Sequence, residues 1–284
     1  MKNRQFEQSL GFSFLRLCMG IVLLILFVIF YDIFSKGIHA VNWEFLTAMP
    51  RKGMTEGGIF PAIVGTTLVS FITAVLAIPL GMGCAIYLNE YAANNRLTRL
   101  IRMSIRNLSG VPSIVYGLFG VVLFVQFMHL GTSILSAGLT LGLMTLPWTI
   151  TASEESLKNI PRSYREGSLA LGATKWQTIR TNVLPYAVPG MLTGTILGLS
   201  RAAGETAPIL FTGVAFYLPF LPNSLSSQFM ALPYHLYIMS TQHHAITQVR
   251  PIAYGTALVL IVLVFLMNSF AIFLRYKLRK VRKE

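Results

Sequence analysis

The amino-acid sequence predicts an all-α membrane protein that crosses the bilayer several times. Apolar residues make up 54% of the 284 residues and charged residues only 12%, about half the share found in soluble domains. The mean hydropathy is +0.63. Several apolar stretches reach the length of about 20 residues that a spanning helix needs. These observations exclude an ordinary soluble protein.

Six stretches are predicted to span the membrane. Basic residues precede the first, as in a secretory signal, but its apolar run exceeds the roughly 7–15 residues of a signal, so we expect it to be retained. The second is long enough to tilt, and Pro79 predicts a kink within it. The predicted spans are Leu17–Phe34, Ile59–Leu88, Val111–Met128, Ser133–Thr151, Ala187–Pro208 and Ile252–Leu274.

The basic residues predict the orientation of these spans. The chain has 23 Lys and Arg residues against 10 Asp and Glu, a net charge of +13. Most of them lie before the first span, at 96–106, at 158–180 and after the last span. The positive-inside rule places these segments, and therefore both termini, in the cytoplasm. The charge thus indicates topology, with anionic lipid as a lesser contact, and it leaves nothing for nucleic-acid binding to explain.

Smaller features complete the predicted topology. The external segment Phe216–Pro251 is expected to contain a short helix on the outer face near Leu232–Met239. Asp32 and Glu90 lie at span ends and are expected to reach the membrane interface. The tetrapeptide Gly-Thr-x-Leu recurs and is interpreted as helix-packing chemistry, since small residues let spans approach closely. Its copies begin at Gly65, Gly194 and Gly255.

A polar island between the fourth and fifth spans is predicted to form two short helices. Gly172 is placed to end the first helix in a left-handed conformation. Thr174 and Gln177 form a Thr-x-x-Gln capping box that begins the second, and Pro185 is expected to end it. We call residues 162–185 the knob. The knob is either a plain connection between spans or a rigid helix pair to which another protein binds.

The knob resembles the cytoplasmic EAA loop of permease subunits in binding-protein-dependent ABC importers. That family pattern is Glu-Ala-Ala, three residues, Gly, nine residues and Ile-x-Leu-Pro. Glu166, Gly172 and the pair Leu184-Pro185 follow this spacing. The chain departs from the pattern at Gly167, Ser168 and Asn182.

Two further motifs resemble phosphate-transport permeases of the PstA type. One is Arg-Ala-Ala-Gly-Glu-Thr-Ala-Pro at 201–208, and the other is Gly-Gly-Ile-Phe-Pro-Ala-Ile-Val-Gly-Thr at 57–66. The likeness covers about residues 57–275 and implies the six-helix architecture of a type I ABC importer permease. The implied regions are a cytoplasmic tail, first span and external loop (1–58), a permease core (59–275) with its EAA loop (154–185), and a basic cytoplasmic tail (276–284).

The resemblance implies a subunit that translocates inorganic phosphate across the cytoplasmic (inner) membrane. Its implied partners are a second homologous permease (PstC-like), two ABC ATPase subunits (PstB-like), an external phosphate-binding protein (PstS-like) and lipid. Another oxyanion or a phosphonate stays open as substrate. So does a stand-alone secondary transporter, which would show inverted repeats or several charged midplane residues. The implied ATPase-docking residues are Glu166, Gly167, Ser168, Leu169, Ala170, Leu171 and Gly172.

Arg201 and Glu205 are the only opposite charges spaced four apart inside a predicted span. An arginine at the bilayer centre costs about 2.5–3.5 kcal/mol on insertion scales. Two interpretations follow. Either Arg201 attracts an anion on the translocation path while Glu205 moderates its field, or the two charges neutralise each other and hold the fold. One offset arginine would bind phosphate weakly enough to release it.

No catalytic, cofactor or metal site is predicted. A P-loop requires Gly-x-x-x-x-Gly-Lys-Ser/Thr, and the chain has no Gly-Lys dipeptide, so any ATP hydrolysis is expected from separate subunits. His243 and His244 are adjacent and lack a nearby carboxylate, which argues against a metal site. Cys18 and Cys84 lie in separate apolar stretches, which argues against a disulfide framework.

Overall fold

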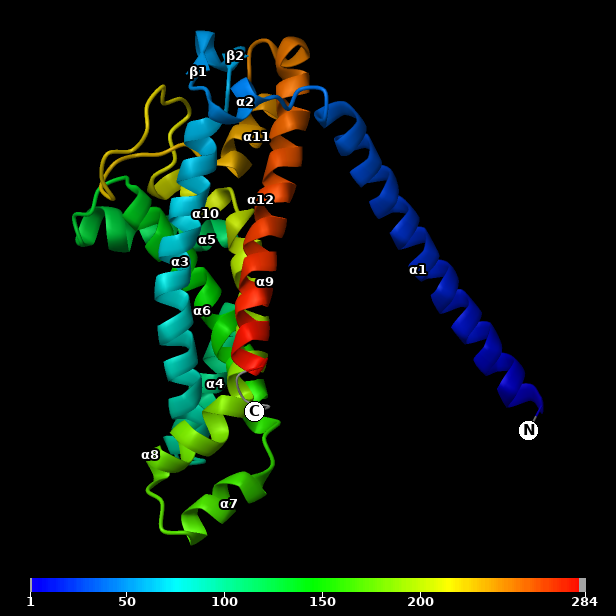
Figure 1. Ribbon diagram of the computed structural model, residues 1–284, viewed down its shortest axis with the longest axis vertical. Coiled ribbons are helices and arrows are strands. Elements are labelled where there is room, and N and C mark those ends of the chain that lie inside the picture. Colours follow the sequence, from blue (N-terminus) through cyan, green and yellow to red (C-terminus); the bar gives the residue numbers. More distant parts are fainter. Residues whose placement is uncertain (1, 281–284) are drawn as a thin grey trace.

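The computed structural model describes residues 2–280, whose helices form an elongated bundle with the knob at one end (Figure 1). Helices α3 (Phe60–Ile86), α6 (Ile134–Lys158) and α9 (Leu184–Ala203) pack against one another, and α12 (Ile246–Lys280) packs against α9. We call the end that carries the knob the knob end. The opposite end carries a small two-stranded hairpin at residues 50–57, and we call it the hairpin end.

The first helix leaves the bundle. α1 (Lys2–Gly37) packs against α12 near the hairpin end and then runs away from the other helices (Figure 1). Its apolar segment Gly11–Gly37 contains the predicted first span, and none of its most apolar window is buried within the chain. The predicted last span lies inside α12. Residues 281–284 of the predicted basic tail lie outside the described residues.

The hairpin end holds small elements that the all-α prediction did not include. They are α2 (Trp43–Thr47), β1 (Pro50–Arg51), the 3₁₀ turn η1 (Lys52–Met54) and β2 (Glu56–Gly57). The two strands pair antiparallel, with Pro50 opposite Gly57. Because each strand has only two residues, no alternating apolar pattern marks them in the sequence.

The short helix expected in the external segment is present, and one face of it is buried. α11 (Leu232–Thr241) follows the short helix α10 (Ala207–Thr212) after a long loop and packs against α12. Its residues Leu232, Ile238 and Met239 belong to the hydrophobic core at the hairpin end. Its other face is exposed, at Tyr237, Ser240 and Thr241.

The predicted third span differs most from the structure. Val111–Met128 falls on α5 (Ser113–Gly120) and the π-helical turn η3 (Val121–Phe127), which together rise only about 20 Å, less than the roughly 30 Å of a bilayer core. The preceding helix α4 (Arg96–Leu108) is bent from them by 104°. Pro112 explains the break, since the residue before a proline disfavours helix. Among the described residues, five helices could each cross a membrane, and this bent pair would make a sixth.

The expected helix end at Pro185 is wrong. The chain is helical from Lys175 to Ala203, running from α8 (Lys175–Thr178) through the π-helical turn η4 (Ile179–Val183) into α9. Pro185 lies in the first turn of α9. The widened turn before it already interrupts the regular hydrogen-bond pattern, so the missing N–H and the ring are tolerated. The knob therefore continues directly into a spanning helix.

The Gly-Thr-x-Leu tetrapeptides lie at close packing contacts, as predicted. A Cβ atom at Gly194 of α9 would lie 2.0 Å from the Cβ of Ala152 in α6. A Cβ atom at Gly65 of α3 would lie 2.1 Å from the carbonyl oxygen of Met230. Any side chain at these two positions would force the packed segments apart.

Candidate functional site: the knob and two arginine ion pairs

The knob consists of two short helices that meet at a left-handed glycine. α7 (Arg162–Ala170) ends before Gly172, whose φ is +83°. The predicted capping box begins α8: the Gln177 backbone N–H donates to Thr174 Oγ1 at 3.3 Å, and the Thr174 N–H donates to Gln177 Oε1 at 2.8 Å. The predicted local structure of this turn is confirmed in detail.

The knob presents its surface to solvent in the single chain. All nine residues of α7 are exposed or half-buried. Of the seven predicted docking residues, Ser168 is half-buried and the other six are exposed. Leu171 is 90% exposed at the turn. A helix pair with so little core of its own must be held by contacts at its base.

Ser168 joins the two halves of the knob. Its hydroxyl oxygen accepts hydrogen bonds from Thr178 Oγ1 and from Asn182 Nδ2, both at 3.0 Å. Ser168 and Asn182 stand where the EAA pattern has alanine and isoleucine. Two of the departures from the family pattern therefore contact each other, and a polar pair replaces an apolar one.

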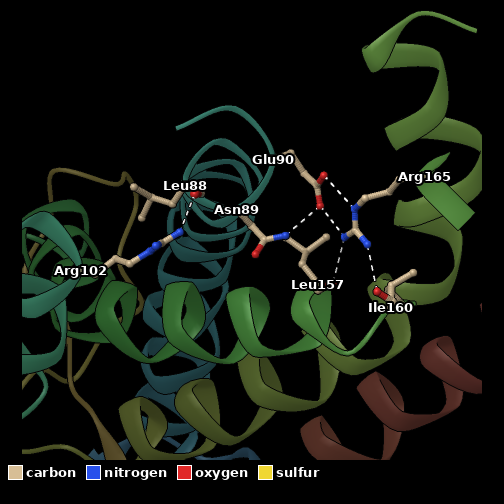
Figure 2. Close-up of polar contacts among 7 residues, drawn as sticks. All are labelled: Leu88, Asn89, Glu90, Arg102, Leu157, Ile160 and Arg165. Atoms are coloured by element: carbon tan, nitrogen blue, oxygen red, sulfur yellow. Dashed lines mark hydrogen bonds and ion pairs between the residues drawn. The ribbon is translucent and has the colours of Figure 1, made fainter. Parts of the chain in front are cut away.

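A buried ion pair fixes α7 to the end of α3 (Figure 2). The last turn of α3 continues as the π-helical turn η2 (Tyr87–Tyr91), which carries Glu90. Arg165 of α7 donates from Nη2 to Glu90 Oε1 at 2.7 Å and from Nε to Oε2 at 3.1 Å. The Glu90 side chain is only 6% exposed. Glu90 lies at the end of the span, as expected, and its carboxylate is held by a partner 75 residues away, which the sequence does not predict.

Arg165 also binds the end of α6. Its Nη1 donates to the carbonyl oxygen of Ile160 at 2.9 Å, and its Nη2 donates to that of Leu157 at 3.1 Å (Figure 2). Carbonyls at the C-terminus of a helix have no partner within the helix, so the guanidinium satisfies them. Asn89 Nδ2 donates to Glu90 Oε1 at 2.8 Å. One arginine thus joins α7, α6 and η2.

A second buried ion pair lies beside the first. Arg102 of α4 donates from Nη2 to the carbonyl oxygen of Leu88 at 2.7 Å (Figure 2). Its Nε lies 2.6 Å from Glu154 Oε1 of α6, although the N–H is not aligned with that oxygen for a hydrogen bond. The Glu154 side chain is 9% exposed. Both arginines therefore contact the Leu88–Glu90 segment and the end of α6.

Sequence reasoning does not predict these roles for Arg165, Arg102 and Glu154. It treats Arg102 and Arg165 only as positive-inside charges. Acidic residues are scarce in this chain, ten against 23 basic ones, and this scarcity is the signal that could have indicated the ion pairs. An acid at or beside an apolar span in such a chain needs a nearby cation, because a lone buried charge is strongly unfavourable.

The predicted ion pair of Arg201 and Glu205 forms, but its arginine is more exposed than Arg102 and Arg165. Arg201 lies in the last turn of α9, and its Nε donates to Glu205 Oε1 at 3.2 Å. The Arg201 side chain is 52% exposed and that of Glu205 16%. The Arg201 Cζ lies 5.6 Å from the ring centroid of Trp148 in α6. The helix ends at Gly204, so the guanidinium lies at a helix terminus.

His243 has a structural role at the hairpin end. Its Nε2 lies 2.9 Å from the carbonyl oxygen of Gly53, and its ring stacks on that of His244 at 4.4 Å. Within residues 2–280, no group of three His, Cys, Asp or Glu side chains is arranged to hold a metal ion.

Comparison with known proteins decides the family. The family model for the binding-protein-dependent transport system inner membrane component matches residues 77–280. The chain belongs to this family. The matched region contains the knob and all three arginine pairs described above.

Two relatives and one solved structure agree with this assignment. The chain is 33% identical over 277 residues to the probable ABC transporter permease protein YqgI of Bacillus subtilis, covering 94% of each chain. It is 31% identical over 287 residues to the phosphate transport system permease protein PstA 1 of Mycobacterium tuberculosis, covering 99% of this chain and 91% of the relative. A crystal structure of a bacterial ABC transporter involved in the import of the acidic polysaccharide alginate matches 96% of this chain and 99% of its own, with TM-score 0.66 and 14% identity.

The protein is therefore an inner-membrane permease subunit of an ABC importer, with the helical architecture of a type I importer permease. Permeases of this family work with ATPase and substrate-binding components and are not themselves catalytic.

Proposed function

We propose that this permease carries inorganic phosphate into the cell, driven by ATP hydrolysed on separate subunits. Relatives named as phosphate permeases are 31–34% identical over most of the chain. The observation that carries the proposal is the state of Arg201. Among the described residues its guanidinium donates one hydrogen bond, from Nε to Glu205. Both Nη groups remain available for phosphate oxygens, in the planar geometry that suits a bidentate contact.

Glu205 and Trp148 adjust the strength of that contact. The carboxylate of Glu205 offsets part of the charge of Arg201, and the ring of Trp148 lies against the guanidinium. A transport path needs sites that bind strongly enough to admit an ion and weakly enough to release it. A single, partly neutralised arginine meets that requirement.

The knob is the proposed docking site for an ATPase subunit. Residues 166–172 lie at the exposed tip, and α7 has contacts at its base but little core. In this proposal the knob end and both termini face the cytoplasm, where the basic segments concentrate. A second homologous permease, two ABC ATPase subunits and an external phosphate-binding protein complete the importer, with residues 59–275 of this chain as its permease core.

The substrate is tested by uptake of radiolabelled phosphate into vesicles that contain the co-purified complex. We expect Arg201→Gln to abolish uptake while the complex still assembles, and Arg201→Lys to retain part of it because charge remains without the planar geometry. We expect the double variant Arg201→Gln with Glu205→Gln to stay inactive. Recovery of the double variant to the parental rate would show that the pair is only structural. Uptake that another oxyanion or a phosphonate competes away at lower concentration would reassign the substrate, and uptake without ATP would indicate a secondary transporter.

Docking is tested with Gly172→Arg, which places a long charged side chain at a left-handed position of the knob. We expect the subunit to insert but the ATPase to be lost on purification. Retention of a normally coupled ATPase would mean that the knob is only a connection.

A further inference from the structure

The knob contacts η2 through both of its helices. Arg165 of α7 binds Glu90, and Lys175 of α8 has its Nζ 5.0 Å from the ring centroid of Tyr91. The chain itself links the knob to α6 and to α9, but not to α3. Contact with the end of α3 therefore depends on side chains distant in sequence: the polar pair across 75 residues, and an apolar cluster that holds Ala85 and Leu88 together with Val183 of the knob.

The attachments of α7 are polar and few. All its residues are exposed or half-buried, so apolar packing contributes little to its position. Tyr164 meets Tyr186 of α9 edge to face, with ring centroids 4.9 Å apart. Arg165 supplies four hydrogen bonds, two of them to the buried carboxylate of Glu90. A bidentate, desolvated pair of this kind holds a fixed geometry that a single exposed contact does not.

The other side of the same segment is held by α4. Arg102 binds the carbonyl oxygen of Leu88, two residues before Glu90 (Figure 2). Its charge also lies beside Glu154 of α6. Residues 88–90 are thus held between α7 and α4. They belong to a π-helical turn, a type of turn that is frequent at functional sites within helices.

We propose that Arg165 and Glu90 are positioning residues that connect the knob to the second spanning helix, α3, so that displacement of the knob moves α3 directly and α4 through Arg102. This inference rests on the proposed function of the knob as the ATPase-docking site. It adds a third helix to the two that the chain itself connects to the knob. Motion then reaches α3 through this polar contact as well as through the apolar cluster of Ala85, Leu88 and Val183, and a paired substitution removes the polar contact alone.

The test separates coupling from folding with a paired apolar replacement. Glu90→Leu with Arg165→Met leaves no unpaired charge, and such replacements of buried ion pairs are often neutral for stability. The matched control is Glu56→Gln, which breaks the exposed Lys52–Glu56 pair at the hairpin end. Each variant is purified as the complete complex, and its melting temperature is recorded.

Hydrogen–deuterium exchange is then measured with and without ATP and vanadate. In the parental complex and the Glu56 control, we expect trapping to change exchange in the knob and in residues 84–91. In the paired variant the knob still responds, whereas the response of 84–91 falls severalfold, because only the apolar contacts of that segment with the knob remain. The expected melting temperature is close to the parental value, which excludes unfolding as the cause.

Two results would overturn the inference, and they differ in whether they also refute the ATPase-docking proposal. An unchanged response of 84–91 in the paired variant, with the knob responding normally, would refute the connection and leave the docking proposal intact. A knob that does not respond to ATP and vanadate in the parental complex would refute the docking proposal, and the inference with it.

Discussion

Two arginine–glutamate pairs in this permease contain the same chemical groups but differ in almost every physical respect. Arg165 donates four hydrogen bonds to two other segments, η2 and the end of α6, and its partner Glu90 is 6% exposed. Arg201 donates one, to a residue one turn along the chain, and is 52% exposed. The guanidinium of Arg165 uses its N–H groups to hold α7, α6 and η2 together. Among the described residues, the guanidinium of Arg201 donates only to Glu205, which leaves its Nη groups for the proposed anion.

The energetic consequences of breaking the two pairs should differ accordingly. Removing one partner of a buried pair leaves an uncompensated charge and costs about 3–5 kcal/mol. The Arg201 side chain is 52% exposed, so its pair with Glu205, just beyond the end of α9, should contribute only about 0.5 kcal/mol. The two pairs therefore predict opposite phenotypes, one on stability and one on transport.

The largest expected effect on stability comes from Glu90→Gln. It leaves Arg165 buried without a counter-charge, so the free energy of unfolding should fall by about 3–5 kcal/mol. The matched control is Glu205→Gln, the same substitution beside the other arginine, for which we expect less than about 0.5 kcal/mol. Denaturant titration of the purified subunit in detergent measures both. Equal losses in the two variants would remove the distinction between a structural and a ligand-binding arginine.

The features that the sequence predicts correctly depend on local chemistry. Apolar stretches of spanning length, the Thr174–Gln177 capping box and the left-handed Gly172 each follow from a few neighbouring residues. The Arg201–Glu205 pair is predictable for the same reason, since residues four apart on a helix are neighbours whatever the rest of the chain does. The close approaches at Gly65 and Gly194 follow from the small size of glycine.

The features that the sequence does not reveal depend on contacts between distant segments. No local pattern joins Glu90 to Arg165, so the sequence does not predict this ion pair. The continuation of the helix through Pro185 requires a π-helical turn, which leaves no composition signal. The bend before α5 is also hidden in the sequence. Pro112 indicates a break, but the apolar run Val111–Met128 that contains it has the composition of a spanning helix, and the run is the stronger of the two signals.

A smaller effect on stability is expected from Gly172→Ala, which tests the left-handed turn between the two helices of the knob. The φ of Gly172 is +83°, and a Cβ added there would meet no atom within 4 Å, so backbone strain is the cause of any loss. A side chain in this conformation costs about 1–2 kcal/mol. The matched control is Gly167→Ala within α7, where space is also open and alanine favours the helix by up to about 1 kcal/mol. Melting of both variants in detergent should therefore shift in opposite directions, and a shared direction would contradict the left-handed turn.

The smallest effect concerns the hydrogen bonds that join the halves of the knob. Ser168→Ala deprives Thr178 and Asn182 of their shared acceptor, and we expect a loss of about 1 kcal/mol. Ser163→Ala, on the same helix and exposed, is the control and should change little. Adding Asn182→Ile to Ser168→Ala recreates the alanine and isoleucine of the family pattern and should restore stability, because the amide that has lost its Ser168 acceptor is replaced by an apolar side chain beside the alanine. If the second substitution instead adds a further loss, the two departures do not compensate each other, and the knob keeps its shape through its caps and its anchor at Arg165 alone.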